Sequence, residues 1–93
     1  MARRDRSDPD WRAVFAEELA RWEQKSYAEL RAALSDVVAY AREGPGGPYQ
    51  VEVQLLEDLP DYVHVAVGVC APHGFLCVPI SGSFIRHSDG RLG

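Results

Sequence analysis

The chain has 93 residues, a net charge of −4 and a hydrophobic content of 46%, the composition of one folded domain rather than of a disordered segment. Its acidic balance argues against a surface made to bind nucleic acid or an anionic membrane. No apolar run approaches the ~20 residues that span a bilayer, and the opening "MARRDRSDPD" lacks the apolar segment of a secretory signal. With 2 cysteines and no export signal, we expect a cytoplasmic protein whose thiols are free.

Residues 9–35 are predicted to be helical, and residues 1–7 before them are predicted to be disordered. Asp8 and Pro9 are typical of a helix start, because Asp8 can accept from the first-turn amides and Pro9 suits the first helical position. A second helix is predicted after Ser26, which can form a capping box with Glu29. Apolar residues in the first helix recur every three or four positions and form one stripe: Trp11, Val14, Phe15, Leu19 and Trp22.

Residues 37–86 are predicted to form an antiparallel sheet. The β-branched and aromatic residues of 37–42 favour a strand, although the preceding helix could also continue through them. The glycines and prolines of 44–48 predict a loop, and residues 49–55 alternate as in a half-buried strand. A last strand is expected through 76–80, ended by Ser81-Gly82-Ser83. The strand between them has a valine at every second position: Val63, Val65, Val67 and Val69.

The predicted fold class is therefore α+β, with two N-terminal helices packed on one face of a three- to four-stranded antiparallel β-meander. Both apolar stripes need a surface to cover, and the row of valines is the only one large enough. Burial of each large aliphatic side chain contributes roughly 1.5–3 kcal/mol, so this packing should dominate the fold. We expect a single domain over residues 1–93.

The segment "VCAPHGFLCV" can form a hairpin in three registers. A two-residue loop would pair Cys70 with Cys77 and permit a disulfide, but it requires from Pro72 an amide hydrogen that proline lacks. A bulged type I turn would place Cys70 opposite Leu76. A loop over residues 71–74 would align the valines with residues 76, 78 and 80. We favour this last register because it keeps the large side chains on one face.

The chemically active residues do not form a recognisable site. Cys70, His73 and Cys77 lack the second close pair of donors that zinc motifs have, so no metal or cofactor is predicted. His64 and Cys70 share a strand face but stand about 20 Å apart at ~3.3 Å per residue. His64 can sit across from Ser81 or Ser83, with no acid placed to orient it. We therefore predict no catalytic residue. A ligand site using His64 and Ser81, or catalysis by His64 with Cys70 or Cys77, remains the alternative.

The second face of the sheet carries small or apolar side chains in place of charges: Ala66, Gly68, Cys70, Phe75, Cys77 and Pro79. An uncovered apolar face of this kind usually marks an interface. The opposing possibility is that the helices lie on opposite faces or that the chain ends wrap across. We predict a non-enzymatic interaction module that binds a protein partner or itself, and within that a symmetric homodimer first.

Several landmarks follow one another in a set order: Trp22, the segment 26–30, a glycine-proline turn, the strand 49–53, and the segment 79–85 with Asp89-Gly90 closing. This order resembles a family of short uncharacterised bacterial α+β proteins over roughly residues 15–92. The family has no assigned activity, so the resemblance implies no catalytic or binding residue. The chain departs from the family pattern at residues 71–77, where other members tend to have an acidic, glycine-rich turn.

Overall fold

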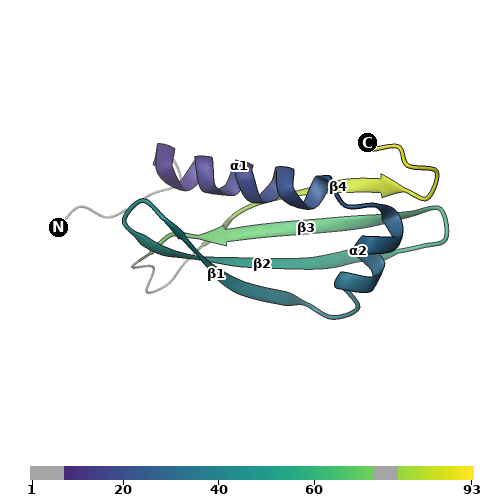
Figure 1. Ribbon diagram of the computed structural model, residues 1–93, viewed down its shortest axis with the longest axis horizontal. Helices are drawn as coiled ribbons and strands as arrows, with labels where there is room; N and C mark the ends of the chain where they lie inside the picture. The colour runs from purple at the N-terminus through teal and green to yellow at the C-terminus, as the bar shows by residue number, and fades with distance from the viewer. Residues whose placement is uncertain (1–7, 73–77) are drawn as a thin grey trace.

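The computed structural model describes residues 8–72 and 78–93. Two helices, α1 (Pro9–Glu23) and α2 (Tyr27–Ala33), precede four strands, β1 (Val38–Gly44), β2 (Gly47–Asp58), β3 (Tyr62–Cys70) and β4 (Ile80–His87). The strands form one antiparallel sheet in the order β1-β2-β3-β4 (Figure 1). The predicted α+β fold with helices on an antiparallel meander is confirmed. The disorder expected of residues 1–7 lies outside the described residues.

Both helices begin where the sequence predicts. The Asp8 carboxylate accepts from the amides of Asp10 at 2.8 Å and Trp11 at 3.3 Å, with Pro9 in the first turn. At α2, the Ser26 hydroxyl accepts from the Glu29 amide at 3.1 Å, and the Glu29 carboxylate accepts from the Ser26 amide at 2.8 Å. These two bonds lower the pKa of Glu29. The caps satisfy first-turn amides that have no partner inside a helix.

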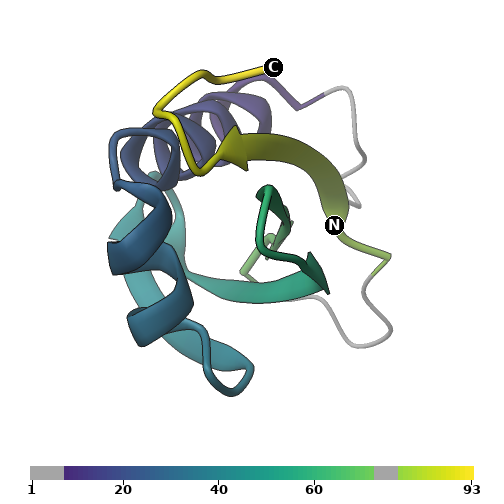
Figure 2. The ribbon, with the colours of Figure 1, turned by 90° about the vertical axis from the view of Figure 1, so that its right-hand side faces the viewer.

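The core lies between α1 and the row of valines on β3. Val63, Val65, Val67 and Val69 are each 0% exposed. Viewed along the long axis, both helices lie on the same side of the curved sheet (Figure 2). The apolar stripe of α1 packs onto this row, together with Leu30 of α2 and the inward side chains of β2. The helices therefore cover the valine face, as predicted.

The last strand starts later than predicted. β4 begins at Ile80, which pairs with Val69, and it passes through Ser81, Gly82 and Ser83 without a break. The predicted register is therefore wrong, because Val69 pairs with Ile80 and not with residue 76, and residues 78 and 79, expected in the strand, precede it. The rest of the predicted strand and loop lies in residues 73–77, outside the described residues. The offset from the favoured register is four residues, an even number, so Ile80 still shares a face with the valines.

Packing explains why Gly82 does not end the strand. Gly82 lies on the inner face opposite Val67, and a Cβ at this position would come 2.9 Å from Cζ of Phe15. A side chain here would push α1 away from the sheet. The glycine is thus required by close approach of the helix, and this tertiary contact overrides the low strand propensity of glycine.

Cys70 is disulfide-bonded. The prediction of a free thiol is therefore wrong for Cys70. That prediction came from the expectation of a reducing compartment, whereas persistent disulfides are typical of oxidising ones. The cytoplasmic location remains a prediction, and this disulfide argues against it. Among the described residues, neither helix has the length and apolar content that a membrane crossing requires.

Candidate functional site on the outer face of the sheet

The outer face of the sheet is the face turned away from α1 and α2. Over residues 8–72 and 78–93, no helix covers it, and Ser81 and Ser83 of β4 are exposed on it. A hollow of about 500 Å³ lies on this face, within the size range of small-molecule sites. The following residues line the hollow: Ala39, Gln50, Val51, Glu52, Gln54, Ala66, Val67, Gly68, Cys70, Pro79 and Ser81.

Four of the residues predicted for an interface lie together at this hollow, namely Ala66, Gly68, Cys70 and Pro79. Gly68 packs against Pro79, whose Cβ would lie 3.6 Å from a Cβ added to the glycine. Phe75 and Cys77 lie outside the described residues. Small residues therefore line the hollow together with three polar residues that are not among the predicted site residues, namely Gln50, Glu52 and Gln54.

A cluster of polar side chains adjoins the hollow on the same face. His64 Nε2 lies 2.9 Å from the Ser83 hydroxyl oxygen, and His64 Nδ1 lies 3.6 Å from a carboxylate oxygen of Glu57. The serine that meets His64 is thus Ser83, and not Ser81. His64 and Cys70 stand six positions apart on β3, and the structure does not bring them together.

A β-bulge brings Glu57 into this cluster. The pairing of β2 with β3 shifts between Leu55, opposite Val65, and Glu57, opposite His64. In an unbroken alternation Glu57 would share the inner face of Leu55, but the extra residue Leu56 turns it outward. Unbroken pairing would place Leu56, and no acid, opposite His64, so regular alternation predicts no acid there. Leu56 itself is 53% exposed, as expected of the extra residue in a bulge.

Tyr62 completes the cluster. Its hydroxyl donates to Glu57 at 3.2 Å, and its ring lies 6.1 Å from the ring of His87. Shielding from water and the bond to Glu57 raise the pKa of Tyr62. Glu57 therefore faces a phenol on one side and an imidazole on the other. Among the described residues, no group of three or more histidine, cysteine, aspartate or glutamate side chains is placed to hold a metal ion.

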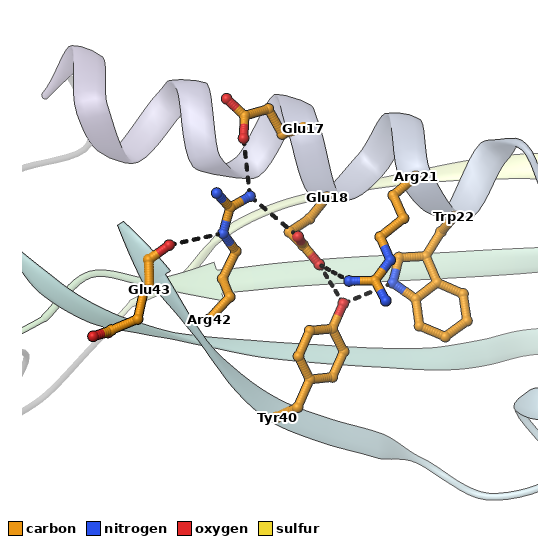
Figure 3. A network of polar contacts seen from close by, with 7 residues as sticks. All are labelled: Glu17, Glu18, Arg21, Trp22, Tyr40, Arg42 and Glu43. Atoms are coloured by element: carbon orange, nitrogen blue, oxygen red, sulfur yellow. Dashed lines mark hydrogen bonds and ion pairs between the residues drawn. The ribbon is translucent and has the colours of Figure 1, made fainter. Parts of the chain in front are cut away.

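A second polar network lies between α1 and β1 (Figure 3). Its centre is Glu18, which is 3% exposed. The Tyr40 hydroxyl donates to Glu18 and accepts from the Trp22 indole at 2.9 Å, and Arg42 donates to the other Glu18 oxygen at 3.2 Å. Burial, followed by the bond to Glu18, raises the pKa of Tyr40.

Arg42 joins this network to the helix surface. Its guanidinium lies 3.0 Å from a carboxylate oxygen of Glu17. Burial disfavours the charge on Arg42, but the carboxylates of Glu17 and Glu18 outweigh it and raise the pKa of Arg42. We interpret the network as a structural contact that fixes α1 on β1, because its groups satisfy one another. Glu18 stands three residues after Phe15, within the apolar stripe, and a charge at that position is the signal that predicts a buried pair.

Comparison of the chain with protein-family models, with curated proteins and with solved structures finds no match. The resemblance to short bacterial proteins therefore stays a prediction, and the function is argued from the geometry.

Proposed function

We propose that this protein is a small interaction module that self-associates through the outer face of its sheet. The observation that carries the proposal is the hollow of about 500 Å³ lined by Ala66, Gly68 and Pro79, on a sheet face that no helix of the described chain covers. A sheet normally packs another layer on each apolar face. Here the second layer would be a second copy of the chain.

The shape of the described chain supports this proposal. Its principal extents are 48 × 22 × 18 Å and its radius of gyration is 14.0 Å. A compact domain of this length has a radius of about 12 Å. A second copy on the outer face would add its thickness along a short dimension and produce a more compact particle.

The size and charge of the face predict a weak dimer. Four strands ~4.8 Å apart, with about eight residues of ~3.3 Å each, give roughly 500 Å² per copy and about 1,000 Å² for two. That total is at the lower limit for a specific interface. Among the described residues that line the hollow, Glu52 is the only charged one, and it stands opposite Gly68. A symmetric pairing that places one hollow on the other would bring the two Glu52 carboxylates together, which opposes association.

Light scattering after gel filtration tests the proposal. As the concentration rises to the high micromolar range, the mass should rise from 10.3 kDa to about twice that value. Gly68→Arg should keep the chain monomeric with an unchanged circular dichroism spectrum, because the new side chain fills the hollow. Glu52→Gln should shift the transition to lower concentration by removing the repulsion.

Ala20→Arg is the matched control, because it adds the same side chain on the exposed side of α1. It should dimerise like the wild type. A wild-type chain that stays at the monomer mass at high micromolar concentration, or equal effects of the two arginine variants, would refute self-association through this face.

A further inference from the structure

We propose that Ser83 is an acyl-accepting nucleophile, with His64 as its general base and Glu57 as a positioning residue, and that the adjoining hollow binds a small carboxylic ester. The three groups come from one chain, one each on β4, β3 and β2, so the monomer carries the whole site, and a second copy on the outer face would cover it. The order of contacts is serine to imidazole to carboxylate, at 2.9 and 3.6 Å. This is the arrangement by which a base activates a hydroxyl nucleophile.

The cluster is open to a substrate. The His64 side chain is 27% exposed and that of Glu57 is 48% exposed, while Ser83 is exposed on the outer face. The carboxylate at Nδ1 favours the tautomer in which Nε2 is free to accept the Ser83 proton. A contact of 3.6 Å at Nδ1 is long for a hydrogen bond, and such bonds commonly tighten only when substrate is bound.

A backbone donor for the oxyanion is also available. The Ile85 carbonyl accepts from the Gly93 amide at 3.0 Å, so the polar groups of Ile85 face away from β3. Polar groups of alternate residues in an antiparallel strand point to the same edge, so the Ser83 amide faces that edge too. Within the described chain, only the bridge between Arg86 and Leu92 occupies that edge. The Ser83 amide can therefore donate to the negative oxygen of a tetrahedral intermediate.

The hollow indicates the class of substrate. Ala66 stands opposite Ser83 and lines the hollow, which places the hollow directly beside the nucleophile. Its walls are small side chains and the amides of Gln50 and Gln54, and the Glu52 carboxylate repels anions. An uncharged or cationic ester of a short carboxylic acid fits these properties, whereas a phosphate-bearing thioester does not.

The reaction has two balanced steps. In the first, the Ser83 oxygen bonds to the carbonyl carbon, its proton passes to His64, and the ester bond breaks as His64 protonates the departing alcohol. In the second, water attacks the acyl-serine, its proton passes to His64, and that proton returns to Ser83 as the carboxylic acid leaves. Water is the only co-reactant.

A fluorophosphonate probe tests the nucleophile directly, because it bonds to an activated serine with loss of fluoride. Intact mass and peptide mapping of the full chain should show one adduct, at Ser83. Ser83→Ala should abolish the adduct, and His64→Ala should slow its formation by about 100-fold or more through loss of the base. Ser35→Ala is the matched control: it removes an exposed serine hydroxyl that lies in neither the hollow nor the His64 cluster, so labelling should be unchanged.

Glu57 has its own test. Glu57→Gln keeps an acceptor for Tyr62 but removes the charge, so labelling should slow about tenfold. Glu57→Asp should recover part of the rate at an unchanged unfolding temperature, which a purely structural role would not produce. The absence of an adduct on the wild-type chain, or a His64→Ala variant that labels at the wild-type rate, would overturn the assignment. Labelling is measured at low micromolar concentration, where the weak dimer is dissociated, so neither result depends on self-association.

Discussion

The indole nitrogen of Trp11 donates a hydrogen bond of 2.7 Å to the carbonyl of Val69, a residue 58 positions further along the chain. Both residues are buried, with Trp11 4% exposed and Val69 0%. Apolar burial brings α1 onto the valine row but is not directional. This bond is directional, and it sets where the start of α1 lies on β3.

Trp11→Phe should therefore destabilise the fold by about 1–3 kcal/mol. The aromatic ring stays, but the Val69 carbonyl loses its donor in a buried position, and an unsatisfied buried acceptor carries this cost. Urea unfolding measures the difference. Trp22→Phe is the comparison, because Tyr40 keeps its bond to Glu18 when the indole is removed, so its cost should be smaller. Equal costs for the two variants would contradict a special role for the Trp11 bond.

The elements that repeat regularly in the sequence are those that could be predicted. The apolar residues of α1 recur every three or four positions and define one face of the helix, and the alternating valines define one face of the sheet. In a short chain these two apolar faces are expected to pack against each other. The caps at Asp8 and Ser26 could also be predicted, because each capping contact joins residues no more than three positions apart in the sequence.

The parts that could not be predicted depend on breaks in regularity. The bulge at Leu56 moves Glu57 to the outer face, and nothing near it in the sequence is typical of a bulge. The passage of β4 through Gly82 is explained by the close approach of Phe15, a contact between distant residues. For this reason the pairing of Glu57 with His64 was missed, while the small-residue patch beside it was found from simple alternation.

Gly82→Ala should destabilise the fold by about 1–2 kcal/mol, the usual cost of overpacking. The new Cβ would lie 2.9 Å from Phe15, so either the ring or α1 must shift. Gly68→Ala is the matched control on the neighbouring strand. Its Cβ would lie 3.6 Å from Pro79, an ordinary contact, so the change should stay within ~0.5 kcal/mol.

The double variant Phe15→Leu with Gly82→Ala checks the cause. Leucine lacks the far end of the ring, so the alanine should cost less in this background than in the wild type. Thermal unfolding of the four chains gives the coupling between the two positions. Additive effects would show that the ring is not what requires the glycine.

Glu18→Ala should cost about 2 kcal/mol in the free energy of unfolding. It removes the acceptor of both the Tyr40 hydroxyl and one Arg42 bond, and breaking a buried pair is normally more costly still. The expected cost is lower than for a fully buried pair because Arg42 keeps its ion pair with Glu17 and its side chain is 27% exposed. Glu17→Ala is the matched control: its side chain is 63% exposed, and loss of a surface pair costs under about 1 kcal/mol. Similar costs at both positions would contradict a buried centre at Glu18.

The same network predicts a loss of stability at alkaline pH. Burial first, and then the bond to Glu18, raises the pKa of Tyr40 above its ordinary value of 10.0. A raised pKa means that the folded state favours the neutral phenol. This contribution is complete below the unfolded pKa of tyrosine and is lost as pH rises through the folded pKa of Tyr40.

Urea unfolding of the wild type and of Tyr40→Phe between about pH 8 and 11 tests this prediction. At the lower pH the variant should be less stable, because it lacks the hydrogen bonds to Glu18 and Trp22. The difference should shrink as pH rises, since only the wild type can lose a proton at this position. Tyr62→Phe separates the contribution of the outer-face phenol, whose pKa is raised as well. A gap between the wild type and Tyr40→Phe that stays constant over this range would show that the buried phenol does not couple folding to pH.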